Sequence, residues 1–143
     1  QDYEAERIEQ AKKIFLMTAG WAVQKYNQRL EKEQEILRDL ADIAIEIFAM
    51  ESAWLRAQKA WQKQGQEVAQ FKVNLARAYV CEALPKIERL AQHAFCAMEE
   101  GDTLRIQLSI LRKLANYEPI NEVVCTREIA RRVIEAGKYS GAS

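Results

Sequence analysis

The 143-residue sequence is poor in glycine, proline and histidine, with five, two and one of them respectively. So few turn-forming residues argue against a turn-rich β-sandwich, a collagen and a disordered chain. A single histidine also cannot supply the two Glu-x-x-His pairs that a di-iron carboxylate bundle requires. The sequence is therefore that of a folded protein, and it does not match the common α/β enzymes or the di-iron proteins.

An excess charge of one sign and long apolar runs are also missing. Twenty-one Lys and Arg balance 21 Asp and Glu, so the chain has no basic field for nucleic acid. The longest uncharged run, Ile14 to Gln24, is about half of the roughly 20 residues that a membrane span needs. Residues 1–4 include two acids and show no secretory leader. We expect a cytoplasmic protein with neither a nucleic-acid partner nor a transmembrane segment.

The three cysteines, Cys81, Cys96 and Cys125, match neither a CxxC motif nor a zinc knuckle. We expect reduced thiols that act as small buried hydrophobic residues. The only histidine, His93, lies on the same expected helix as Cys81 and Cys96, so a Cys–His pair would lack a separate base-bearing element. Phosphate-binding glycine motifs and nucleophile elbows are absent too. The sequence therefore predicts no catalytic, cofactor-binding or metal-binding residue in this chain.

Strong helix formers dominate what is present, and apolar residues recur at steps of three and four. These patterns predict helices over Asp2–Arg29, Glu33–Lys63, Glu67–Met98, Thr103–Asn116 and Pro119–Ala136. Helix ends are expected at Gly65, Gly101 and Gly137. A chain of this length buries enough surface to need no disulfide or metal. We predict one all-α domain over residues 1–143, an up-and-down bundle of four long helical segments plus a shorter C-terminal one.

Two of the expected helices contain unusual segments. Residues 14–23 are apolar around almost the whole circumference, so we expect this part of the first helix to be covered on more than one side. Pro85 lies inside the third helix, where proline removes a hydrogen-bond donor and clashes with the preceding turn. We therefore expect either a kink near Val80–Leu84 or two shorter helices.

Glu51 interrupts the apolar row that the second helix is expected to bury. That row consists of Leu37, Leu40, Ala44, Ile47, Glu51 and Trp54. A buried carboxylate must be paired or protonated, and such groups are common at functional sites. No second acid, base or nucleophile can be placed beside Glu51. We therefore favour a structural ion pair with a Lys or Arg of the first or third helix over a catalytic role.

Two further groups each allow a functional and a structural interpretation. Trp21, Trp54 and Trp61 could form a protein interface, but core packing explains one or two of them equally well. Arg127, Arg131 and Arg132 could hold a phosphate. They also lie near a helix C-terminus, where solvated cations are ordinary, and we favour that interpretation.

Residues 33–57 contain the pattern Gln34-x-x-Leu37-x-x-Leu40-Ala41-Asp42, followed by Ala49-Met50 and Arg56-Ala57. In this pattern the sequence resembles the C-terminal extension of acyl-CoA dehydrogenases of the very-long-chain type. Three further segments are similar to bacterial members of the group: Ala22-Val23-Gln24-Lys25-Tyr26, Leu114-Ala115-Asn116-Tyr117-Glu118-Pro119 and Arg127-Glu128-Ile129-Ala130. The similarity covers nearly the whole chain but rests on packing and capping residues.

In that family an FAD-binding catalytic region precedes the extension and oxidises fatty acyl-CoA in β-oxidation. The resemblance implies that this chain is a non-catalytic accessory domain, with the FAD held by the catalytic region and none held here. It also implies partners: the catalytic region of the parent chain or a second subunit. Membrane association, attributed in mitochondrial relatives to the start of the extension, is not expected here. Two alternatives remain, a standalone helical adaptor that binds a partner protein's helix, and a metal-binding bundle enzyme.

Overall fold

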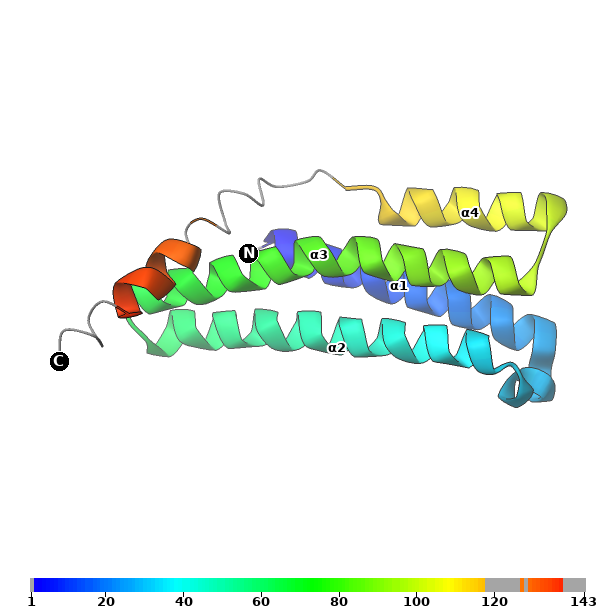
Figure 1. The fold of residues 1–143 in the computed structure, drawn as a ribbon, viewed down its shortest axis with the longest axis horizontal. Coiled ribbons are helices and arrows are strands. Elements are labelled where there is room, and N and C mark those ends of the chain that lie inside the picture. The colour runs from blue at the N-terminus through cyan, green and yellow to red at the C-terminus, as the bar shows by residue number, and fades with distance from the viewer. Residues whose placement is uncertain (1, 118–126, 128, 138–143) are drawn as a thin grey trace.

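The chain folds into an all-α bundle (Figure 1). The computed structural model describes residues 2–117, 127 and 129–137. Its helices are α1 (Asp2–Tyr26), α2 (Gln34–Lys63), α3 (Gln66–Met98) and α4 (Gly101–Ala115), with a 3-10 helix η1 (Asn27–Lys32) between α1 and α2. Each α-helix runs back along the one before it (Figure 1), which confirms the predicted up-and-down bundle. Residues 129–137 form a short helical segment within the predicted fifth helix.

Positive backbone φ angles mark two of the helix boundaries. The first helix ends at Tyr26 and not at Arg29, because Asn27 adopts a φ of 51° and η1 follows. Asparagine tolerates this left-handed conformation better than most residues. Gly101, with a φ of 68°, opens α4 at a position that favours glycine. Gly65 is the residue before α3, as its predicted role at a helix end requires.

Helix α3 continues through Pro85 from Gln66 to Met98, so the expectation of two shorter helices is wrong. Proline costs this helix one backbone hydrogen bond. The neighbouring residues Ala83, Leu84 and Ile87 are buried against the other helices, and this packing holds the two sides of Pro85 in one element.

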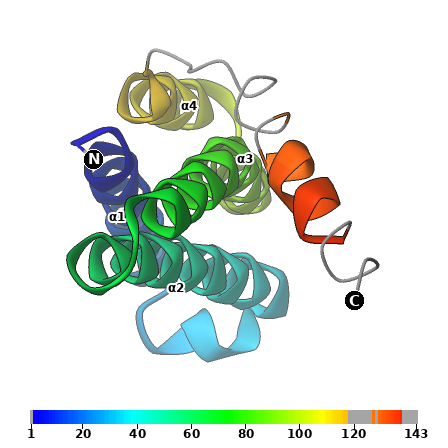
Figure 2. The same ribbon diagram turned by 90° about the vertical axis from the view of Figure 1, so that its left-hand side faces the viewer.

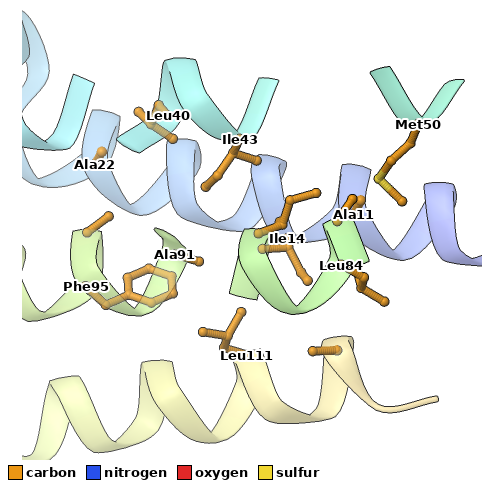
Figure 3. Packing of buried hydrophobic residues seen from close by; sticks show 14 of the residues in the cluster. Ala11, Ile14, Ala22, Leu40, Ile43, Met50, Leu84, Ala91, Phe95 and Leu111 are labelled. Atoms are coloured by element: carbon orange, nitrogen blue, oxygen red, sulfur yellow. The ribbon is translucent and has the colours of Figure 1, made fainter. Parts of the chain in front are cut away.

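The core lies where α1, α2 and α4 surround α3, as the end-on view shows (Figure 2). Figure 3 shows how the four helices contribute to it. Labelled there are Ala11, Ile14 and Ala22 of α1, Leu40, Ile43 and Met50 of α2, Leu84, Ala91 and Phe95 of α3, and Leu111 of α4. Fully burying a large apolar side chain contributes about 1.5–3 kcal/mol relative to its exposure. The bundle is therefore held chiefly by this cluster.

The apolar middle of α1 is covered over most of its circumference, because half-buried residues pack against the core beside the buried ones: Phe15, Met17, Ala19 and Trp21. Ile14, Thr18 and Ala22 are buried, whereas Leu16 and Val23 are exposed. The expectation that this segment is covered on more than one side is therefore confirmed, since α1 packs against α2, α3 and α4. Leu16 and Val23 lie on a part of α1 that the described elements leave open.

Helix α2 buries a different row from the one predicted. Its inward row is Ile36, Leu40, Ile43, Ile47, Met50, Trp54 and Ala57. Of the predicted members, Ala44 is exposed and Glu51 is half-buried. The correct row keeps the same alternation of steps of four and three, but passes through Ile43 and Met50. The helix therefore carries apolar residues on both its inward and its outward side.

The connected ends of α2 and α3 extend beyond the start of α1 (Figure 1). Tyr3 and Glu4, in the first turn of α1, contact Cys81 and Arg77 of α3. The residues of α3 that precede Arg77 therefore lie beyond the N-terminus of α1. Here α2 and α3 pack on each other through a small cluster of Ala53, Ala57, Val73 and Ala76. We call residues 55–75 the overhang.

Candidate functional site

Glu51 forms an ion pair between α2 and α1. Its Oε2 lies 2.8 Å from Nζ of Lys12, which donates a hydrogen bond to it, and 40% of the Glu51 side chain is exposed. The hydrogen bond from Lys12 raises the pKa of that lysine. Glu51 is thus half-buried and not a buried carboxylate, because α2 is rotated relative to the predicted row. The pair is a link between two helices.

His93 contacts an acid that sequence spacing does not reveal. Its Nδ1 lies 2.5 Å from Oδ2 of Asp39, a buried residue of α2, while 62% of the His93 side chain is exposed. The hydrogen bond and the charge of Asp39 raise the pKa of His93 above 6.5. Among the described residues, no group of three or more His, Cys, Asp or Glu could hold a metal ion.

We expect the His93–Asp39 pair to make stability depend on pH. Since the folded pKa of His93 is raised, its contribution is fully present below pH 6.5 and is lost as pH rises through the raised value. The urea midpoint of the wild type, measured from about pH 5.5 to about pH 9, should fall relative to that of His93→Gln.

The single histidine gives one imidazole signal in NMR, so its pKa can be read directly. In Asp39→Asn that pKa should return towards 6.5, because the negative charge beside the ring is removed. An unchanged titration in this variant would show that Asp39 does not hold the proton on His93.

The two described cysteines lie on different parts of α3. Cys81 is buried and its Sγ lies 3.4 Å from the hydroxyl of Tyr3. Cys96 is exposed, so the expectation of a buried residue is wrong there. Cys125 lies outside the described residues.

The C-terminal arginines make structural contacts. Arg131 pairs with Glu135 one turn later on the same helical segment, at 2.7 Å. Arg132 donates a hydrogen bond from Nη1 to the backbone oxygen of Glu67 at 3.2 Å, which ties this segment to the start of α3. Arg127 is exposed. Arg131 and Arg132 thus serve helix stability and helix contact, the structural interpretation of this group.

The three tryptophans do not form one cluster. Trp21 of α1 and Trp54 of α2 are half-buried and pack against the core. Trp61, in the overhang, is 47% exposed. Nε1 of Trp54 is buried and has no hydrogen-bond partner among the described residues. Of the three tryptophans, only Trp61 is therefore exposed.

Exposed apolar side chains gather along α2 and on the overhang. Phe48 is 72% exposed, and Ile45, Leu55, Val68 and Leu75 are also exposed. An isolated exposed apolar residue is ordinary, but a gathering of them marks a contact surface. The prominent feature of this structure is thus an uncovered apolar face.

A groove of about 560 Å³ runs along this face between α2 and α3. We call it the α2–α3 groove; it is lined by Phe48, Ala49, Ser52, Ala53, Arg56, Lys72, Leu75, Ala76 and Tyr79. At one end the Tyr79 hydroxyl donates to Glu46 at 2.9 Å, and Lys86 donates to the same carboxylate at 2.8 Å. Burial opposes ionisation of Glu46, but these two hydrogen bonds outweigh it and lower its pKa. Burial and the bond to Glu46 raise the pKa of Tyr79 to about 12.

Comparison with known proteins shows which family this chain belongs to. The sequence profile of a family described as "Acyl-CoA dehydrogenase, C-terminal domain" matches residues 10–113. The chain belongs to this family. It is 48% identical over 133 residues to a probable acyl-CoA dehydrogenase of Bacillus subtilis (strain 168), a match over 93% of this chain and 22% of that protein.

A solved structure agrees with the family assignment. The chain matches a crystal structure of an acyl-CoA dehydrogenase complexed with FAD from Bacillus anthracis, with a TM-score of 0.87 and 44% identity. That match covers 93% of this chain and 23% of the solved chain. This member of the family therefore spans less than a quarter of the length of either relative.

Sequence reasoning missed the groove because it treated most apolar residues as core. For the second helix it predicted a single apolar row, through Ala44 and Glu51, which leaves out Phe48. The signal was nonetheless present, since α2 carries two apolar rows and a helix with a single covered side needs only one.

Proposed function

We propose that this chain is the non-catalytic C-terminal accessory domain of an FAD-dependent acyl-CoA dehydrogenase. Its role is to pack on the catalytic region or to mediate subunit contacts. The observation that carries this proposal is the uncovered apolar face of α2 and the overhang, because a contiguous exposed apolar face marks a surface that contacts another protein. Trp61 belongs to this face.

The parent activity is part of the same proposal. The relatives are acyl-CoA dehydrogenases, and one of them is complexed with FAD, which supports FAD as the cofactor of a catalytic region outside this chain. The substrate would be a fatty acyl-CoA, and the resemblance of residues 33–57 supports the very-long-chain type. The exposed free thiol of Cys96 supports a reducing compartment such as the cytoplasm. Among the described residues, no helix is both long enough and apolar enough to cross a membrane.

The alternative is an independent helical adaptor, which the same apolar face would also suit. The two functions differ in what precedes the domain, so the reading frame upstream of residue 1 is the first discriminating observation. A flavoenzyme encoded there supports the accessory domain, and its absence supports the adaptor.

A biochemical test compares the parent enzyme with a truncated form that lacks residues 1–143. We expect both to bind FAD and to bleach it with an acyl-CoA in a single turnover, since the chemistry lies in the catalytic region. The truncated form should unfold at a lower temperature or change its assembly state. Equal thermal stability and equal assembly of the two forms would contradict a packing role, and turnover by residues 1–143 alone would contradict a non-catalytic one.

A further inference from the structure

The α2–α3 groove has the form of a site for one helix. On α2, Ile45, Phe48, Ser52 and Leu55 follow one another at steps of three, four and three. On α3, Val68, Lys72, Leu75 and Tyr79 follow at steps of four, three and four. Alternation of this kind keeps each row on one side of its helix and is the spacing by which helices pack along their length.

Small residues line the groove between the two rows. Ala49, Ala53 and Ala76 line it together with the larger Phe48 and Leu75. Small side chains let a further helix approach closely, as α-helices pack with their axes about 8–10 Å apart. The groove therefore suits a rod-shaped apolar occupant.

The charges around the groove specify the occupant further. The whole chain is neutral, but the overhang carries four cations and one acid: Arg56, Lys59, Lys63, Lys72 and Glu67. Arg56 and Lys72 line the groove itself. Within the described part of the chain, none of these four cations forms an ion pair, although 21 acids are available in the sequence. An occupant that places carboxylates beside them would be electrostatically complementary.

The position of α1 indicates where the occupant comes from. The family is a C-terminal domain, so the rest of a parent enzyme precedes it and enters through α1. The overhang lies just beyond the start of α1 (Figure 1), beside that point of entry. Over three-quarters of each relative lies outside the part that this chain matches, which is ample chain to supply a covering helix.

We propose that the α2–α3 groove binds an amphipathic helix of the catalytic region of the same polypeptide, with Asp or Glu beside its apolar row. Phe48 and Leu75 would contact the apolar row, while Arg56 and Lys72 would pair with the acids. This inference rests on the proposed function and adds to it the surface used and the chemistry of the partner.

The test uses the full parent enzyme with a specific protease site placed just before residue 1. After cleavage, the fraction of residues 1–143 that separates from the catalytic region is measured by analytical ultracentrifugation. We expect Phe48→Glu to raise the dissociation constant at least tenfold, since it places a charge among apolar groups and opposite acids. Arg56→Glu combined with Lys72→Glu should weaken the complex as well and abolish most of its sensitivity to salt.

Ile106→Glu provides the matched control. Ile106 is 56% exposed on α4, away from the groove, so the same kind of change should leave dissociation as in the wild type. Both Phe48 and Ile106 are exposed, so neither variant should disturb the core, which far-UV circular dichroism of the enzymes checks.

The outcomes distinguish a failure of the proposed docking site from a failure of the proposed function. If Phe48→Glu and Ile106→Glu dissociate like the wild type, the groove is not the docking site, although a wild-type domain that stays bound still supports packing. If the wild-type domain separates freely after cleavage, the proposed function itself fails. Loss of enzyme oligomers in Phe48→Glu without release of the domain would show that the occupant is a second copy. Loss of binding to phosphatidylserine vesicles, again without release, would show a membrane surface instead.

Discussion

Replacing Phe95 by Ala should cost about 3–5 kcal/mol of unfolding free energy. Phe95 is fully buried in α3 and lies in the core near Ala91 and Leu111 (Figure 3). The change removes most of a large side chain from the cluster that joins all four helices, and the surrounding helices cannot close the space fully. Urea denaturation of the domain followed by circular dichroism measures the loss.

Phe48→Ala is the matched control, because it makes the same chemical change at an exposed site. Phe48 is 72% exposed, so its truncation in the isolated domain should change stability by less than about 0.5 kcal/mol. A loss as large as that of Phe95→Ala would mean that Phe48 is buried in solution, for instance by self-association. The pair thus separates the role of the core from the role of the outer face.

Arg77→Met should destabilise the domain by about 3 kcal/mol. Nε of Arg77 lies 2.9 Å from Oε1 of Glu4, whose side chain is 2% exposed. Removing the guanidinium leaves a buried carboxylate with one fewer counter-charge, and this costs more than a surface pair because water cannot replace the arginine. Breaking a buried ion pair costs about 3–5 kcal/mol, and we expect the lower end of this range because a third of the Arg77 side chain is exposed. The free energy of unfolding in urea reports the effect.

Arg105→Met is the control for this change. Arg105 pairs with Asp102 on the surface of α4, and both side chains are largely exposed. Exposed pairs contribute little, so the loss should stay below about 0.5 kcal/mol. Equal losses in the two arginine variants would show that burial of Glu4 does not strengthen its pair. The double variant Glu4→Gln with Arg77→Met should lose less unfolding free energy than Arg77→Met alone, because the pair then leaves no charged carboxylate buried.

The sequence was sufficient to predict the helices and their order, because glycine is rare and apolar spacing is regular. It was not sufficient to predict which side of α2 faces the core. That helix has apolar residues on two sides, and rows through Ala44 and Glu51 or through Ile43 and Met50 satisfy the same spacing. Only packing against α1 and α3 selects the second row. The misplacement of Glu51 and the neglect of Phe48 follow from this one ambiguity.

The sequence could not predict which residues form ion pairs between helices, for a related reason. Asp39 and His93 are 54 positions apart, and Glu4 and Arg77 are 73 apart. A period along one helix tells which side a residue occupies, but it does not give the register between two helices. The expected partner of Glu51 was therefore given only as a Lys or Arg of a neighbouring helix, and Lys12 could not be singled out from the other candidates.

The alanine cluster at the far end of α2 and α3 has a dynamic consequence. Alanine buries little apolar area, and no segment of α1 reinforces this end, so its amides should exchange with solvent through local opening at a lower free energy than those beside Phe95. A ligand that binds only the closed form would slow this exchange by mass action. Hydrogen exchange in residues 55–75 would then report occupancy of the neighbouring surface without any label attached to it.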